Sequence, residues 1–96
     1  MYILITYDVD TVSRTGQKRL RQVAKLCKDY GQRVQNSVFE CEMTEAQFVA
    51  LKSKISAIID MELDNIRFYF LSSRSHGKVI TLGKVTSYNV EDAIII

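Results

Sequence analysis

Two kinds of hydrophobic pattern alternate along the chain, and their order restricts the possible folds. Residues 2–9, YILITYDV, place apolar side chains at every second position, as in a half-buried strand. Residues 16–30 instead repeat apolar side chains at helical spacing, through Leu20, Val23, Ala24 and Cys27. The strand pattern returns in residues 32–41. The first half of the chain is therefore predicted to fold as strand, helix and strand.

The second half repeats this order. Residues 44–47, TEAQ, have the spacing of a helix capping box and precede a second amphipathic helix that continues to about residue 59. Residues 65–71 alternate as a strand, and residues 78–85 are a further strand candidate. We predict a ferredoxin-like α+β sandwich, in which two helices cover one face of an antiparallel sheet. One strand is missing from this count, so residues 32–41 are predicted to form one long strand followed by a bend near Glu42, or the sheet borrows a strand from elsewhere.

One face of such a sheet stays without helices. Strand alternation assigns eight residues to this open face: Leu4, Thr6, Asp8, Gln35, Ser37, Phe39, Tyr69 and Leu71. The mixture is too apolar for a solvent face and too polar for a core. A two-fold homodimer through this face resolves the conflict, because such interfaces are self-complementary.

Length and composition indicate one domain spanning residues 1–96. The chain has 47% hydrophobic and 25% charged residues and no proline, which is typical of a globular protein. It begins directly in a strand pattern, without a basic segment before an apolar one, which predicts a cytoplasmic location and no membrane association. Cys27 and Cys41 fit no metal-binding spacing and are expected to be reduced core thiols.

The charge is distributed unevenly. Residues 14–33 hold seven basic residues and one acidic residue, a local charge of +6 in a chain whose net charge is +2. Such asymmetry indicates an anionic partner on one side of the molecule. The same basic residues could also be an ordinary solvated helix face.

Asp8 ends the most apolar strand, where two interpretations are open. The strand could simply be leaving the core, or Asp8 could remain on the sheet and bind a cation. Asp10 lies in a polar segment and is better explained as a turn or helix cap. Tyr7 points to the opposite face from Asp8, where it would pack with its hydroxyl at the rim of the core. His76, the only histidine, falls in a late loop and offers no general base.

Four stretches carry a resemblance to a known family: YDV at the end of the first strand, KRLRQVAKLCKDYG, QRVQNSVFEC and IRFYFL. Together they resemble the CRISPR-associated Cas-two family, over about residues 2–71, and the third stretch resembles its type I-C branch most. The resemblance implies a ferredoxin-like homodimer with a core of residues 1–71. Residues 77–96 would form a C-terminal strand and tail at the dimer interface, with the strand crossing to the partner's sheet.

The resemblance also implies functional residues. Two copies of Asp8 near the dimer axis would bind Mg²⁺, or another divalent ion such as Mn²⁺, and act in catalysis, with Tyr7 as a supporting residue. It places Arg19, Arg21, Arg33 and Phe39 in nucleic-acid binding, and Arg14 and Lys18 join them from the basic segment. Phe39 could equally be an interface aromatic. Family members also bridge dimers of the Cas-one integrase during spacer acquisition.

Two functions therefore remain open. The first is a magnesium-dependent endonuclease that cleaves phosphodiester bonds, with double-stranded DNA favoured over single-stranded RNA. The second is a non-catalytic DNA-binding scaffold between integrase dimers. A single carboxylate from each subunit is a sparse catalytic set, and two nearby carboxylates repel each other without a metal.

Overall fold

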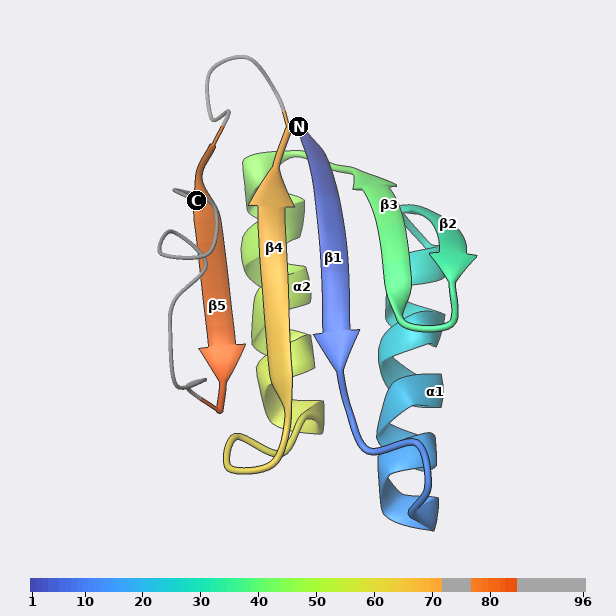
Figure 1. Cartoon of the computed structure of the whole chain (residues 1–96). Coiled ribbons are helices and arrows are strands. Elements are labelled where there is room, and N and C mark those ends of the chain that lie inside the picture. Colours follow the sequence, from blue (N-terminus) through green and yellow to red (C-terminus); the bar gives the residue numbers. More distant parts are fainter. Residues whose placement is uncertain (72–76, 85–96) are drawn as a thin grey trace, which may run out of the picture.

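An antiparallel sheet with two helices on one face forms the molecule (Figure 1). A computed structural model of the chain describes residues 1–71 and 77–84. The five strands lie in the order β2-β3-β1-β4-β5. In chain order the elements are β1 (Tyr2–Asp8), α1 (Arg14–Lys28), β2 (Gly31–Gln35), β3 (Val38–Glu42), α2 (Glu45–Ile58), β4 (Asn65–Phe70) and β5 (Val79–Gly83). The α+β ferredoxin-like architecture predicted from the sequence is confirmed.

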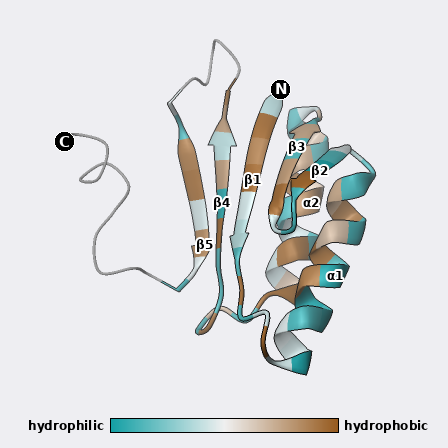
Figure 2. Cartoon of the chain, turned by 45° about the vertical axis from the view of Figure 1, so that its right-hand side comes forward, coloured by the Kyte–Doolittle hydropathy of each residue, from teal (hydrophilic) through white to brown (hydrophobic). Residues whose placement is uncertain are grey.

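The central strands separate the buried face from the open face. In β1, Ile3, Ile5 and Tyr7 are buried, whereas Leu4 and Thr6 are half-buried and Asp8 is exposed. β4 alternates in the same way, with Ile66, Phe68 and Phe70 in the core. Figure 2 shows both helices on one side of the sheet and the other side uncovered. The alternation predicted for these two strands is therefore confirmed.

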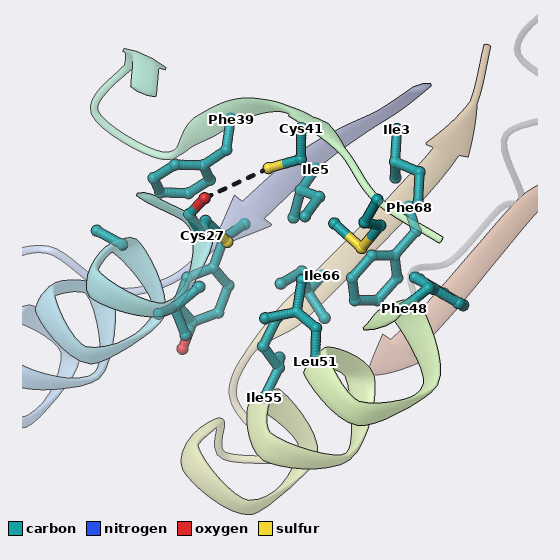
Figure 3. Packing of buried hydrophobic residues seen from close by; sticks show 14 of the residues in the cluster. Ile3, Ile5, Cys27, Phe39, Cys41, Phe48, Leu51, Ile55, Ile66 and Phe68 are labelled. Atoms are coloured by element: carbon teal, nitrogen blue, oxygen red, sulfur yellow. Dashed lines mark hydrogen bonds between the residues drawn. The ribbon is translucent and has the colours of Figure 1, made fainter. Parts of the chain in front are cut away.

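The core lies between the sheet and the helices (Figure 3). The ring of Phe48 from α2 packs edge-on against Phe68 and Phe70, at centroid distances of 5.3 and 5.1 Å. Cys27 and Cys41 are free buried thiols, as predicted, and the Cys41 Sγ donates to the Cys27 carbonyl at 3.6 Å. Such interdigitated apolar packing supplies most of the stabilisation of a small domain.

Side-chain caps explain where the helices begin. The Ser13 hydroxyl accepts a hydrogen bond from the Gly16 amide at 3.0 Å, so α1 starts two residues earlier than its apolar pattern indicates. The predicted capping box of α2 is present. The Thr44 hydroxyl accepts from the Gln47 amide at 3.1 Å, and the Gln47 side chain accepts from the Thr44 amide at 2.9 Å. None of the helices in residues 1–71 and 77–84 is long and apolar enough to cross a membrane.

The prediction of one long strand over residues 32–41 is wrong. The segment is a hairpin of β2 and β3 that turns at Asn36 and Ser37, and it provides the strand missing from the predicted order. The register shifts between Arg33 and Gln35 in β2. β3 alternates regularly, and its pairing with β1 places Phe39 opposite Ile5, fully buried in the core. Its predicted place on the open face is therefore wrong.

The last described strand lies at the edge of the sheet. β5 pairs with β4 of the same chain, with Phe68 opposite Ile80 and Ile66 opposite Leu82. The strand thus extends its own sheet through one of its edges. The crossing of the C-terminal strand to a partner's sheet stays a prediction. The free edge of β4 is the nearest unpaired edge for a strand that follows it so closely in sequence. Residues 85–96, the rest of the predicted tail, and His76 lie outside the described residues.

Candidate functional site

Asp8 lies at the end of β1 on the open face, beside a shallow hollow of about 290 Å³. It stands opposite Asn65, the first residue of β4. The hollow is lined by Thr6, Tyr7, Asp8, Ser37, Asn65 and Arg67. Three segments therefore line the hollow: the end of β1, the start of β4 and the turn of the β2–β3 hairpin. Asp8 stays on the sheet, as the second interpretation of the sequence required.

The described residues around the hollow supply one carboxylate for a metal ion such as Mg²⁺, but not a complete set of ligands. Within the described residues the Asp8 carboxylate makes no hydrogen bond and no ion pair, so its oxygens are free for a metal. Mg²⁺ prefers such oxygens and keeps several waters. However, the described residues contain no group of three or more acidic, histidine or cysteine side chains that could hold a metal. The donor set fits a magnesium ion if a second carboxylate comes from another copy of the chain.

On the core side of the sheet, behind Asp8, a buried ionic cluster holds the end of β1 in place. Arg19 donates to both carboxylate oxygens of Asp64, from Nε at 2.8 Å and from its terminal nitrogen at 3.0 Å. The Tyr7 hydroxyl donates to the same carboxylate, as does the Asp60 amide at 3.0 Å. Asp64 is fully buried. The cluster ties α1, β1 and the start of β4 together next to the candidate site.

The cluster changes the titration of its members. Burial by itself raises the pKa of Asp64, but the hydrogen bonds from Arg19 and Tyr7 outweigh burial and hold the pKa of this carboxyl below its usual value. The pKa of Tyr7 is raised well above its usual value, first by burial and then by the hydrogen bond to Asp64. Tyr7 therefore remains protonated and supports the site structurally, from the core side of the strand.

Asp10 serves as a turn cap, as predicted. Its carboxylate accepts from the Val12 amide at 2.9 Å, and this hydrogen bond lowers the pKa of the carboxyl. A Cβ atom on Gly16 would lie 1.8 Å from the Asp10 carbonyl oxygen, so the first turn of α1 needs glycine to approach this loop. Asp10 does not line the hollow of Asp8.

The structure divides the predicted nucleic-acid residues into two groups. Arg21 and Arg33 are exposed and line a second hollow of about 360 Å³ between α1 and the β2–β3 hairpin. Arg14 and Lys18 are exposed on α1. Arg19 is instead committed to Asp64, and Phe39 is buried with the Arg33 guanidinium 5.8 Å from its ring centroid. This geometry gives Arg19 and Phe39 structural roles.

Asp64 and Arg67 are absent from the residues singled out in the sequence. The signal for Asp64 is an acid directly before the apolar strand of residues 65–71, where a buried partner would be needed. Its partners are distant in sequence, 45 and 57 residues away, so no local pattern could have connected them. Arg67 alternates onto the open face with Tyr69, but the sequence does not show that it shares a hollow with Asp8.

Three known proteins that are similar to this chain in sequence or in fold carry the name Cas2. A CRISPR-associated endoribonuclease Cas2 of Rhodospirillum rubrum is 50% identical over 94 residues, which cover 98% of this chain and 99% of that protein. A CRISPR-associated endonuclease Cas2 of Halalkalibacterium halodurans is 50% identical over 95 residues, covering 99% of each chain. The crystal structure of Streptococcus pyogenes Cas2 at pH 6.5 matches with a TM-score of 0.75 and 59% identity, over 78% of this chain and 90% of that one. The model of the family described as CRISPR associated protein Cas2 matches residues 1–79, and the chain therefore belongs to this family.

Proposed function

We propose that this protein is a CRISPR adaptation protein with metal-dependent endonuclease activity. The observation that carries the proposal is the free carboxylate of Asp8, which borders a polar hollow on the open face of the sheet. The relatives are named endonuclease or endoribonuclease, which supports phosphodiester hydrolysis. The reaction would take place on the open face, where the end of β1 lies beside the start of β4.

The proposed site is completed by a homodimer. The half of the open face away from Asp8 carries exposed apolar side chains, with Tyr2 57% exposed and Leu71 51% exposed, beside the acidic Glu40 and Glu42 of β3. Leu4 and Tyr69 face each other in the register of β1 and β4 between them. Covering this surface with a second copy would bury apolar area and bring a second Asp8 to the same face.

Each residue of the site has a limited part in the proposed mechanism. One Asp8 from each subunit would hold a Mg²⁺ ion, or Mn²⁺ in its place. The bound ion would supply a positioned water and would stabilise the charge that develops on the phosphodiester. The Arg19–Asp64–Tyr7 cluster holds the end of β1, so that Asp8 keeps its position without rearrangement. Tyr7 touches no reacting atom and is a positioning residue.

The substrate is a nucleic-acid backbone, with double-stranded DNA favoured over single-stranded RNA. The names of the relatives include both endonuclease and endoribonuclease. The exposed basic residues of α1 and the hairpin, Arg14, Lys18, Arg21 and Arg33, can contact the phosphates of either nucleic acid, so the preference for DNA is a proposal that cleavage of both substrates tests. Contacts of this kind provide affinity without reading the base sequence.

The single carboxylate of each chain also favours a second function. Because the described residues contain no larger acidic cluster, the protein could serve as a non-catalytic DNA-binding scaffold between dimers of the Cas-one integrase. In this alternative the open face and the basic surface keep their roles in dimerisation and DNA binding. Asp8 would then only end a strand.

Replacement of Asp8 separates the two functions. Asp8→Asn preserves the shape of the side chain and removes its charge, so it should abolish magnesium-dependent cleavage of duplex DNA and leave the dimer intact. Cleavage is measured with magnesium and with a chelator, on duplex DNA and on single-stranded RNA. Asp10→Asn is the matched control, since asparagine can still cap the turn and cleavage should persist. Undiminished cleavage by Asp8→Asn, in protein free of contaminating nuclease, would reject the catalytic role and favour the scaffold.

A further inference from the structure

The open face is divided between apolar and polar residues along the strands. Near the start of β1, Leu4 faces Tyr69 of β4. Near its end, Thr6 faces Arg67, and the next pair on the same face joins Asp8 and Asn65. The apolar half is suited to a protein partner. The polar half, which forms the hollow, is suited to a ligand.

Arg67 lacks the partners that a half-buried arginine requires. Its Nε atom is buried and is the one buried side-chain nitrogen or oxygen without a hydrogen bond in the described residues. It forms no ion pair with Asp8, although both line the hollow. A buried donor without an acceptor is costly, and most such groups in proteins are paired. The group that accepts from Arg67 is therefore expected to come from outside the described chain.

Two hydroxyl groups line the same hollow. Thr6 and Ser37 both contribute to its wall, and neither hydroxyl has a hydrogen bond among the described residues. The Asn65 amide nitrogen, by contrast, already donates to the Lys84 carbonyl at 2.9 Å. The hollow thus offers one cationic donor and two neutral donors next to a free carboxylate. This set suits a tetrahedral oxyanion whose remaining oxygen contacts a cation held by Asp8.

We propose that Arg67, Thr6 and Ser37 form a binding site for the phosphodiester group that is cleaved, directly beside Asp8. The inference rests on the proposed nuclease function and adds the residues that position the scissile phosphate. It differs from the basic surface of α1, whose exposed side chains can hold neighbouring phosphates of a long strand. Arg67 suits this task because its planar guanidinium can donate two parallel hydrogen bonds to a phosphate.

Kinetics of cleavage test the site through activity. Arg67→Gln should lower kcat/KM for duplex DNA by about 10- to 100-fold, the usual effect of removing a charge-assisted hydrogen bond. Arg67→Lys keeps the charge but not the planar donor pair, so it should restore activity only in part. Lys54→Gln removes a charge from the exposed surface of α2 and should cleave like the unchanged protein.

A second measurement does not depend on cleavage, and its main result comes from the unchanged protein. The NMR signal of the Arg67 Nε–H group is followed while dimethyl phosphate, a stable phosphodiester, is added to the unchanged dimer. A saturable shift of this signal, weakened by Thr6→Val and unaffected by Lys54→Gln, is expected. A signal that ignores dimethyl phosphate would overturn the proposal, and a shift only on dilution of the dimer would assign Arg67 to a protein contact instead.

The two measurements distinguish failure of the site from failure of the function. If Asp8→Asn abolishes cleavage but Arg67→Gln cleaves normally, the nuclease function stands and the phosphate site is rejected. If the unchanged protein does not cleave but its Arg67 signal responds to dimethyl phosphate, the nuclease function is rejected and the phosphate site stands.

Discussion

Asp64 keeps its charge inside the protein because several donors surround it. Arg19 binds both of its oxygens, and the Tyr7 hydroxyl and the Asp60 amide complete the shell. A buried carboxylate is tolerated only when it is paired in this way. The cluster also has a functional consequence, because Tyr7 precedes Asp8 and Asp64 precedes Asn65, the residue that faces Asp8. The stability of the fold and the position of the candidate site thus depend on the same contacts.

Removing one partner should therefore destabilise the protein strongly. Asp64→Asn leaves the half-buried Arg19 without its counter-charge and should lower the free energy of unfolding by about 3 kcal/mol. Urea denaturation at pH 7 measures this decrease. Glu62→Gln removes an exposed carboxylate from the same loop and should change stability by less than about 0.5 kcal/mol. Equal stabilities of Asp64→Asn and Glu62→Gln would show that the ion pair contributes nothing net.

The same cluster sets a pH dependence. Because the pKa of Asp64 is lower in the folded than in the unfolded protein, the unfolded chain binds more protons in acid. The stabilisation is fully present above the unfolded pKa of about 4 and is lost as the pH falls through the lower folded pKa. The unchanged protein should therefore lose more stability than Asp64→Asn between neutral pH and acid. Urea denaturation of both proteins across this pH range measures the free energy of unfolding. Parallel curves of this free energy against pH would contradict the prediction.

At the scale of elements, the sequence predicted both helices and the faces of β1 and β4. The reason is that these elements keep one period without interruption. It failed at the hairpin of β2 and β3, where the turn at Asn36 and Ser37 contains neither glycine nor proline and the register shifts within β2. Phe39 pairs with Arg33, so the two residues share a face as counted, but that face is the helix side of the sheet and not the open side. In β3 the buried Phe39 and Cys41 alternate with the exposed Glu40 and Glu42, so the acidic residues carried the signal for the correct face.

On the helix side of the sheet, Arg33 lies close to Arg21 of α1, and both residues are expected to bind DNA. Arg21 and Arg33 share one hollow, so Arg21→Ala and Arg33→Ala together should weaken binding of duplex DNA. The salt dependence of log affinity should become shallower by about 0.9 for each phosphate group that the protein no longer binds. Fluorescence anisotropy at several salt concentrations measures both quantities. Lys54→Ala on α2 is the control, and an unchanged slope in the double variant would direct attention to another surface.

Arg19 provides a contrasting prediction within the same helix. The sequence grouped it with Arg21, but its side chain is committed to Asp64. Arg19→Met should reduce stability, since it leaves Asp64 buried without its main partner. DNA binding of the folded fraction, measured below the unfolding temperature, should keep the salt dependence of the unchanged protein. A shallower slope would mean that Arg19 leaves Asp64 to contact a phosphate.

At the scale of the whole molecule, the uncovered sheet face is the feature that most needs a partner. Its apolar half includes the exposed side chains of Tyr2 and Leu71 and the half-buried side chains of Leu4 and Tyr69. A contiguous apolar surface of this kind typically marks a protein interface. The sequence already indicated it, because the helices could cover only one side of the sheet.

A charge placed in this apolar half should separate the subunits. Leu4 lies opposite Glu40 in the register of β1 and β3, so a lysine at position 4 is tolerated within one chain, but dimerisation would remove its charge from water. Sedimentation at micromolar concentration should show a dimer for the unchanged protein and a monomer for Leu4→Lys. Val49→Lys, which changes an exposed apolar residue on α2, should remain dimeric. If the unchanged protein sediments as a monomer, Asp8 has no second carboxylate at its side, and the shared metal site loses its basis.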